Sequence, residues 1–299
     1  MDALSRDPMR AVKPPMSFGK RKRNKIDKKV ASVFLLLHLL CIFAPFQINR
    51  GAFLICLVLF TITGLFGITI SYHRNLSHKS FKIPKWLEYL LAYCGVHALQ
   101  GNPINWVSTH RYHHQFVDTE KDPHTPIHGF WFGYIIWILE EKDGSIAGMN
   151  RKHRKLDNAS DLEKQIFYRF IRKTYLLHPI ALAIILYVIG GFPFFIWGTC
   201  VRTVMLLHST FMVNSFCHMW GNQPWKTNDF STNNWWVSLV TFGEGWHNNH
   251  HAFEYSARLG IEWWQFDIGW YVIMFLQAIG LATNVKLPSQ SHMHKLAQT

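Results

Sequence analysis

Long apolar runs separated by strongly polar stretches are the first feature of the chain. Residues 30–46 and 51–72 form two such runs, joined by a short link. Two further runs cover about 174–190 and 192–213, with two glycines and a proline where they meet. A helix that crosses a hydrocarbon layer of about 30 Å needs about 20 mostly apolar residues, and glycine with proline marks a turn. The pattern predicts an all-α integral membrane protein with four transmembrane helices in two tight hairpins.

Two other apolar segments carry polar residues and are predicted to lie along the membrane surface. Residues 86–99 (WLEYLLAYCGVHAL) contain Glu88 and His97, and they would invert the topology if they crossed the bilayer. Residues 261–279 (IEWWQFDIGWYVIMFLQAI) are rich in Trp, which is enriched at the level of the lipid headgroups. We expect both segments to form interfacial helices.

Charge predicts the orientation of the chain. Only 16% of the residues are charged, yet the formal net charge is +13, and a basic cluster at Lys20–Lys29 precedes the first apolar run. Residues 1–29 are therefore expected to be a cytosolic tail. Four crossings place the loop 73–173 and everything from His218 onward on the same cytosolic side. The membrane domain is predicted to cover 30–287, followed by a cytosolic tail over 288–299.

Composition argues against a nucleic-acid-binding protein and favours one cellular membrane over another. The basic cluster is not part of any nucleic-acid-binding motif, so no nucleic-acid partner is expected. The first 30 residues lack the apolar segment of a signal peptide and contain acidic residues that transit peptides avoid. The endoplasmic reticulum membrane is the expected location, and a plastid membrane is the alternative. Five cysteines without paired spacing indicate reduced thiols.

Three histidine clusters carry the candidate chemistry among the 18 histidines of the chain. The first has the form HxxxxH, and the other two share the form HxxHH: His73 with His78, His110 with His113 and His114, and His247 with His250 and His251. On a helix, positions i, i+3 and i+4 lie on one face, so members of an HxxHH cluster can converge on one ion. The i, i+5 pair is about 140° apart on an ideal α-helix. It can serve one site where the helix leaves the membrane, or two separate metals.

The number and type of these ligands predict two metal ions. Eight imidazoles exceed the needs of one ion, and neutral imidazole suits zinc, copper, iron and nickel. Two redox-inert zinc sites would use the ligands without explaining the membrane setting. Iron with O2 fits better, because attack on an unactivated C–H bond of a lipid tail requires a strong oxidant.

The sequences around these clusters resemble the membrane fatty acyl desaturases with three histidine boxes, and the plant delta-9 acyl-lipid and acyl-CoA desaturase-like group in particular. The resemblance extends over about 30–287 and rests on the strings SYHRNLSHKSFKIPKWLEYLLAYCG, WVSTHRYHHQF, DPHTP, NSFCHMWG, WKTND and GEGWHNNHHAFEYSAR. It implies four transmembrane helices below a cytosolic helical cap that holds a di-iron histidine site.

The resemblance also implies a ligand set. In this family nine histidines bind two irons, and an asparagine reaches one iron through water. Position by position, these are the eight cluster histidines, then His218 of the NSFCH string, with Asn214 as the asparagine. The implied metal ligands are His73, His78, His110, His113, His114, His218, His247, His250 and His251.

Residues around the ligands give further expectations. Carboxylates commonly orient metal-bound imidazoles, which makes Asp118, Asp122 and Glu244 candidates for that role. Animal stearoyl-CoA desaturases read Trp-Ala-Arg-Asp before the second box, and that Arg helps hold the CoA headgroup. In this chain Ser108 stands where those enzymes have the Arg, and Thr109 stands where they have the Asp. The animal-type CoA contact is therefore missing. Trp106 of the same string is a candidate for substrate contact.

The activity implied by the resemblance is O2-dependent desaturation. Two iron ions, with O2 as co-substrate, would place a cis double bond of the delta-9 type in a saturated acyl chain carried on CoA or a glycerolipid. The haem motif HPGG is absent, so the electrons are expected from an external donor, either cytochrome b5 with its reductase or ferredoxin in a plastid. The alternative is a membrane di-iron hydroxylase of fatty acids, sterols or alkanes. A metal transporter, the third possibility, would place its ligands along the membrane spans.

Overall fold

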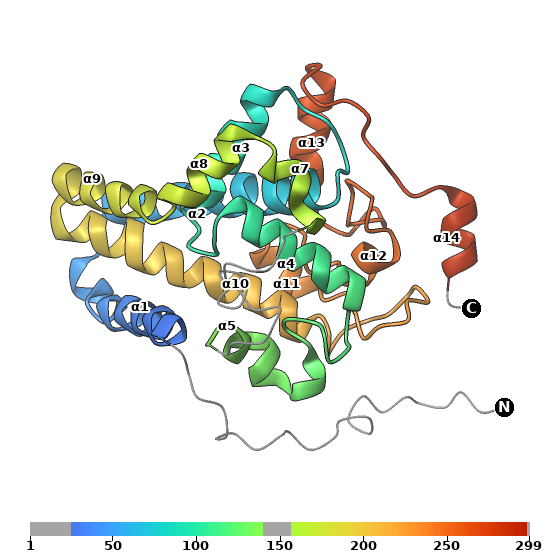
Figure 1. The fold of residues 1–299 in the computed structure, drawn as a ribbon, viewed down its shortest axis with the longest axis horizontal. Coiled ribbons are helices and arrows are strands. Elements are labelled where there is room, and N and C mark those ends of the chain that lie inside the picture. The colour runs from blue at the N-terminus through green and yellow to red at the C-terminus, as the bar shows by residue number, and fades with distance from the viewer. Residues whose placement is uncertain (1–24, 140–156, 298–299) are drawn as a thin grey trace.

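The computed structural model describes residues 25–139 and 157–297. Within these residues the regular structure is helical, and the only β-structure is a set of isolated bridges (Figure 1). The prediction of an all-helical chain is therefore correct for this part of the protein. Residues 20–24 of the predicted basic cluster Lys20–Lys29, and residues 298–299 of the predicted tail, lie outside the described residues.

The first predicted hairpin corresponds to the helices at the start of the described chain. Helix α1 covers Lys25–Cys41, a 3₁₀ turn η1 covers Ala44–Gln47, and α2 covers Arg50–Thr61. Asn49 caps α2, because its side chain accepts a hydrogen bond from the backbone N–H of Ala52 at 2.8 Å. The helix continues without a break into the π-helical segment η2, Ile62–Ser77.

The second predicted hairpin consists of α9, Leu177–Phe194, with η6, Phe195–Val201, and α10, Arg202–Phe216. Gly191 breaks this helical stretch with a φ of 65°, in the left-handed region that glycine tolerates. Figure 1 shows α9 and α10 side by side at one end of the molecule. The turn that the two glycines and the proline predict is therefore present.

Among the described residues, two helical stretches are long and apolar enough to cross a bilayer, Arg50–Ser77 and Leu177–Phe216. The second contains the reversal at Gly191, so it supplies two antiparallel arms. Helix α1 is shorter than these stretches, with 17 residues. The model thus fits a helical membrane protein, and the count of four crossings with a cytosolic cap stays a prediction.

The two segments predicted to lie along the membrane surface are only partly helical. Helix α3 covers Lys85–Val96, close to the expected bounds. Helix α13 covers only Ile268–Ala278, so the expectation of a helix over 261–279 was wrong for its first turns. The side chain of Asp267 accepts a hydrogen bond from the Trp270 N–H at 2.9 Å, which fixes the start of the helix there. The residues before Asp267 form an irregular loop.

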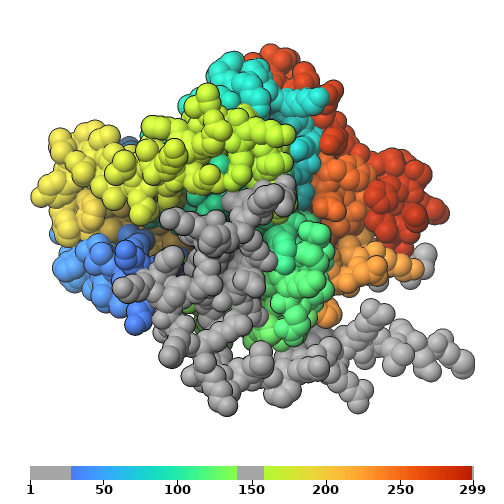
Figure 2. All heavy atoms as spheres, in the orientation of Figure 1, coloured from blue at the N-terminus to red at the C-terminus, as the bar shows by residue number. Residues whose placement is uncertain are grey.

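The second and third histidine clusters each lie on a short helix. Helix α4 covers Pro103–Phe116 and α12 covers His247–Ala252. The remaining elements are short: η3 Pro126–His128, η4 Phe132–Ile136, α5 Trp137–Leu139, η5 Asp157–Ala159, α7 Ser160–Glu163, α8 Ile166–Thr174, α11 Trp235–Val240 and α14 Gln290–Leu296. Figure 2 shows α7 and α8 in yellow-green on the surface, beside α3 in cyan.

A close approach of two backbones holds the first histidine cluster in place. A side-chain carbon added at Gly67 of η2 would lie 2.4 Å from the backbone nitrogen of Gly95 in α3. Only glycine permits this contact, and the side chain of Tyr72 occupies the equivalent position above Gly95. Helix α3 therefore packs directly against the π-helical turns that lead to His73.

Candidate metal centre

The first histidine cluster lies on a π-helix and not on an α-helix. The backbone N–H of His78 donates to the carbonyl of His73 at 3.2 Å, which is the i→i+5 bond that defines this geometry. Such a turn brings positions i and i+5 toward the same face, so the 140° separation expected for an α-helix does not apply. The two rings lie 4.9 Å apart between centroids. Of the two alternatives that the spacing left open, the structure brings both histidines to one group.

The two HxxHH clusters divide their members in the same way. In α4 the first and last histidines, His110 and His114, point to one group, while His113 points to another. In α12 the first and last histidines, His247 and His251, join His113, while His250 crosses over to the other side. Each helix therefore gives an i, i+4 pair to one group and its i+3 member to the second.

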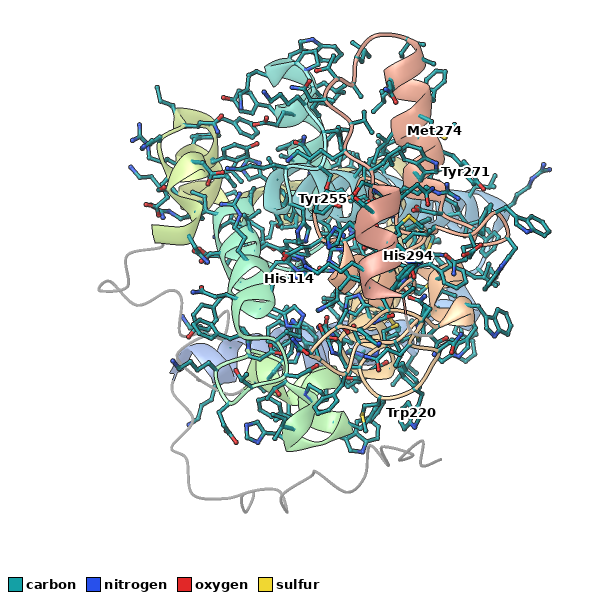
Figure 3. The ribbon with its side chains drawn as sticks, turned by 90° about the vertical axis from the view of Figure 1, so that its right-hand side faces the viewer. His114, Trp220, Tyr255, Tyr271, Met274 and His294 are labelled. Carbon is teal, nitrogen blue, oxygen red and sulfur yellow. The ribbon has the colours of Figure 1, made fainter. Side chains whose placement is uncertain are left out.

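The result is two compact groups of imidazoles. Within each group, the ligand nitrogens all lie within 4.8 Å of one another. The five-histidine group consists of His73, His78, His110, His114 and His250. The four-histidine group consists of His113, His218, His247 and His251. All nine histidines of the predicted ligand set belong to one or the other. Figure 3 shows His114 on α4, on the side of the molecule that faces α14.

The ring nitrogens of the four-histidine group are arranged as they would be around a cation. His218 and His251 direct Nδ1 at the carboxylates of Asp118 and Asp229, at 3.1 Å and 3.0 Å. In the neutral form of each ring, Nδ1 carries the hydrogen and Nε2 carries a lone pair. Both lone pairs lie 3.0 Å from Nε2 of His247. A single hydrogen on Nε2 of His247 cannot bond to both lone pairs, whereas one metal ion can bind all three nitrogens.

The five-histidine group repeats this arrangement. His73 directs Nδ1 at Glu244 at 2.6 Å, and its Nε2 lies 3.0 Å from Nε2 of His250. His250 Nε2 is also 3.0 Å from His114 Nε2. The donor set of each group therefore fits a metal ion, with nitrogen lone pairs directed inward and carboxylates at the outer nitrogens.

All three carboxylates proposed from the sequence touch a histidine of these groups. Asp122 pairs with His113 at 3.0 Å, while Asp118 and Glu244 hold the rings described above. Two more were missed. Asp229 holds His251, and Glu254 approaches Nδ1 of His114 at 3.5 Å. Asp229 stands in the WKTND string, and its presence among the desaturase-like motifs was the only signal for it.

Burial keeps several of these imidazoles neutral. Removal from water, followed by the charges of neighbouring imidazoles, holds the pKa of His114, His247 and His250 well below its ordinary value. For His251, burial lowers the pKa to about 4 although Asp229 opposes the shift. For His218, burial also acts to lower the pKa, but the carboxylates of Asp118, Asp122 and Asp229 together outweigh burial and raise it. Neutral imidazole is the form that binds metal ions.

A buried arginine joins the first and third histidine clusters, and sequence reasoning did not single it out. The Arg74 side chain is 1% exposed and donates to Asp267 at 2.8 Å and to Glu244 at 3.2 Å. Glu244 in turn holds His73. The Arg74 guanidinium also reaches the carbonyl of Ala257 at 2.9 Å. This ion-pair network ties η2 to the turn before α12 and to the start of α13.

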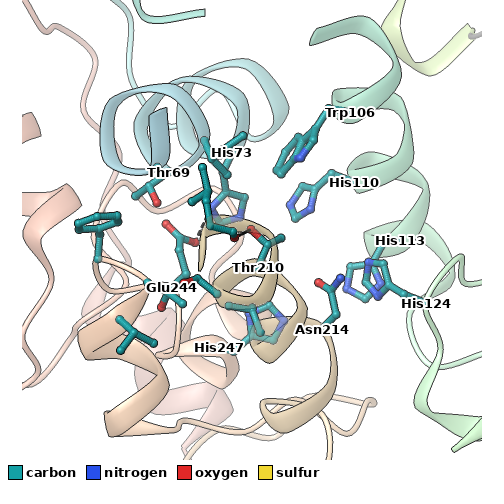
Figure 4. A pocket seen from close by; sticks show the side chains of 18 residues that line it. Thr69, His73, Trp106, His110, His113, His124, Thr210, Asn214, Glu244 and His247 are labelled. Atoms are coloured by element: carbon teal, nitrogen blue, oxygen red, sulfur yellow. Dashed lines mark hydrogen bonds and ion pairs between the residues drawn. The ribbon is translucent and has the colours of Figure 1, made fainter. Parts of the chain in front are cut away.

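A pocket reaches the imidazoles from the side of the long helices (Figure 4). Its lining includes Gly64 and Leu206 from these helices and Phe242 from the turn after α11. Trp106, the candidate for substrate contact, also lines it and stacks on His110 with ring centroids 5.1 Å apart. Asn214 lines the same pocket, together with histidines of both groups. The two groups of histidines thus face a largely apolar pocket.

The two residues that replace the animal-type CoA contact are buried. Ser108 donates to the side chain of Asn158 at 2.6 Å, and Asn158 returns a bond to the Ser108 carbonyl at 2.9 Å. Thr109 donates to the Asn105 carbonyl at 3.0 Å. Ser108 therefore holds α4 against η5, Thr109 bonds within α4, and both side chains are buried.

Other histidines take part in packing or in smaller contacts. His124, expected beside the metal ligands or in a loop, stacks against His113 with centroids 4.2 Å apart. His38 and His208, expected in packing roles, meet at 2.9 Å between their Nε2 atoms. His128 lies beside Glu120, with Nε2 3.2 Å from its carboxylate. None of these three contacts adds a member to the nine-histidine set.

Comparison with known proteins identifies the family. The model of the fatty acid desaturase family matches residues 48–274. The chain is 56% identical over 287 residues to a chloroplastic palmitoyl-monogalactosyldiacylglycerol delta-7 desaturase of Arabidopsis thaliana, covering 96% of this chain and 76% of that protein. It is 54% identical to an acyl-CoA C20 delta-5 desaturase of Anemone leveillei, covering 87% and 82%. It is 51% identical to delta-9 acyl-lipid desaturase 1 of Arabidopsis thaliana, covering 93% and 88%. With its two groups of histidines beside an apolar pocket, the chain belongs to the fatty acid desaturase family and is a fatty acyl desaturase.

Proposed function

We propose that the two histidine groups each hold one iron ion and that the pair desaturates an acyl chain with O2. The convergence of nine imidazoles, with carboxylates behind five of them, is the observation that carries this proposal. Iron with O2 supplies the oxidising power that removal of hydrogen from a methylene group requires. The hydroxylase alternative draws no support from the relatives, whose names are those of desaturases.

The residues of the chain orient and enclose the reaction. The carboxylates fix the tautomer of their imidazoles, so that each Nε2 lone pair points at the metal position. Trp106, Phe242 and Leu206 give the pocket apolar walls that exclude water around an alkyl chain. Positioning of a methylene against the metal position is the part of catalysis that these residues perform.

The product is proposed to carry a cis double bond of the delta-9 type. The support is the resemblance to the plant delta-9 group and the match to two delta-9 acyl-lipid desaturases of Arabidopsis thaliana. Expression in a yeast strain that lacks its own desaturase, followed by gas chromatography of its fatty acids, tests both the activity and the bond position. A delta-5 or delta-7 product would contradict the position but not the activity.

The electron donor is proposed to be cytochrome b5 with its reductase at the endoplasmic reticulum, and ferredoxin is the counterpart if the protein is plastidial. The proposal rests on the need for two electrons per double bond. Iron analysis of the purified protein should give two ions per chain, and added cytochrome b5 should restore turnover. Zinc or manganese in place of iron would contradict the metal assignment.

A further inference from the structure

The pocket beside the histidines has its mouth at the end of α11. Of the described residues that line it, only Val240 is exposed to a large extent, at 43% of its surface. The others range from buried to half-buried, including Leu206 and Val213 of α10 and Phe242 after α11. An acyl chain that reaches the histidines through this pocket therefore passes Val240.

The surface around this mouth is apolar. Next to Val240 on α11, Trp236 is 37% exposed and Leu239 is 53% exposed, and Met205 of α10 is 42% exposed. Helix α10 belongs to the apolar stretch Leu177–Phe216, which is long enough to cross a bilayer. Exposed apolar side chains on a helix that is long enough to span a bilayer are expected to face lipid and not water.

No cation stands in the segments that frame the mouth. The sequence has no Lys or Arg from 203 to 225, from 227 to 257, or from 51 to 73. The CoA headgroup carries phosphates, which proteins bind through arginine, lysine or helix N-termini. Helix α11 has only six residues and directs its apolar face outward, so it offers no such site. Among the described residues, the segments that frame the mouth therefore offer no group that suits the phosphates of CoA.

Exposed aromatic residues gather on the adjoining loop. Trp263 is 88% exposed, Trp264 is 55% exposed and Phe266 is 45% exposed. This loop touches the turn after α11, because Trp264 packs on Trp246 with ring centroids 5.4 Å apart. Trp favours the headgroup level of a bilayer. Figure 3 shows Tyr271 and Met274 on the helix that follows, α13, and both side chains are about half-exposed.

We propose that the mouth at Val240 opens sideways into the bilayer and that the enzyme takes its acyl chain from a membrane glycerolipid. The inference rests on the proposed desaturase chemistry and adds the carrier and the route. The glycerol backbone and headgroup stay at the level of the aromatic loop, while the chain enters between α10 and α11. The buried Ser108 and Thr109 agree with this reading, since neither is available to a CoA headgroup.

The test compares two single substitutions on α11. Val240→Trp fills the mouth, whereas Leu239→Trp makes the same change at an exposed neighbour that does not line the pocket. Each protein is placed in phosphatidylcholine vesicles with its electron donor. One arm carries the labelled acyl chain on phosphatidylcholine, the other on CoA, with acyl exchange blocked. Iron content is measured alongside the product.

The unsubstituted enzyme should desaturate the phosphatidylcholine pool first. Val240→Trp should lower that rate about tenfold or more, because the larger side chain overfills the apolar entrance. Leu239→Trp should keep the rate, and both variants should keep their iron. If the Trp variant loses iron, Val240→Phe, a smaller enlargement, decides the question by the same comparison.

Three results would overturn the inference. Faster desaturation of acyl-CoA by the unsubstituted enzyme would show that the carrier is wrong. If the Val240 variants stay active but desaturate shorter acyl chains, the mouth holds the methyl end of the acyl chain. Retained activity with unchanged chain length would show that the chain does not pass Val240. Absence of product from the unsubstituted enzyme in both arms would instead contradict the proposed function itself.

Discussion

The Asp229→Asn variant is expected to lose metal from the four-histidine group through a change of tautomer. One oxygen of Asp229 accepts from the backbone N–H of Ser231 at 3.0 Å and from Thr227 at 2.7 Å, while the other faces Nδ1 of His251 at 3.0 Å. A backbone N–H cannot reverse its role, so the asparagine must place its oxygen there and its NH2 against His251. The ring then has to accept at Nδ1 and carry its hydrogen on Nε2.

The size of the effect follows from the loss of that lone pair. Carboxylates behind metal-bound histidines typically contribute a factor of about 10–100 in metal affinity. At about 1.4 kcal/mol per factor of ten, this corresponds to about 1.4–2.8 kcal/mol. The assay is competition between the detergent-purified protein and a series of iron chelators. One of the two irons should be released at a lower chelator strength, and desaturation should fall with it.

Glu120→Gln is the matched control for this experiment. Glu120 also pairs with an imidazole, His128, at 3.2 Å, but that histidine belongs to neither group and Glu120 is 69% exposed. Its iron content should be unchanged. If the Asp229→Asn protein bound both irons with normal affinity, the reasoning would be refuted, because the tautomer of His251 would then not control its binding of metal. Equal loss of both irons would show that the two groups do not bind independently.

Three further predictions concern the centre and its setting. His114→Ala should abolish desaturation while membrane insertion remains intact, and normal product would contradict the two-metal assignment. Arg74→Met should lower stability by about 3–5 kcal/mol, since it removes the cation that pairs with two buried carboxylates. Lys79→Met is the control and should change stability by less than about 1 kcal/mol, because the lysine of its ion pair is 61% exposed. Thermal unfolding in detergent measures both. A tag after Thr299 should be cut by protease added to sealed microsomes, and protection would require an odd number of crossings.

The sequence predicted the elements of the fold well where one local signal was strong. Apolar length identified the stretches Arg50–Ser77 and Leu177–Phe216, and the glycines with proline identified the reversal at Gly191. It failed at the start of α13, where the Trp-rich run continued the apolar pattern although the Asp267 side chain caps the helix later. An apolar pattern cannot distinguish a helix from an exposed aromatic loop when both face a membrane.

The candidate site was predictable in membership but not in arrangement. The spacing of the histidine clusters and the resemblance together listed all nine residues. The π-helical geometry of η2, which turns His73 and His78 to one side, depends on packing against α3 through Gly67 and Gly95. The partners of Arg74 lie 170 and 193 residues away in the chain. No local pattern encodes such contacts, so the network became visible only in three dimensions.

The division of histidines between the groups couples the two metal positions mechanically. Because α4 and α12 each give two histidines to one group and one to the other, neither helix can shift without disturbing both groups. Arg74 extends this coupling to Asp267, the cap of α13, and so to the exposed aromatic loop that precedes it. The exposed aromatic loop is therefore tied to His73 of the five-histidine group through one buried ion-pair network.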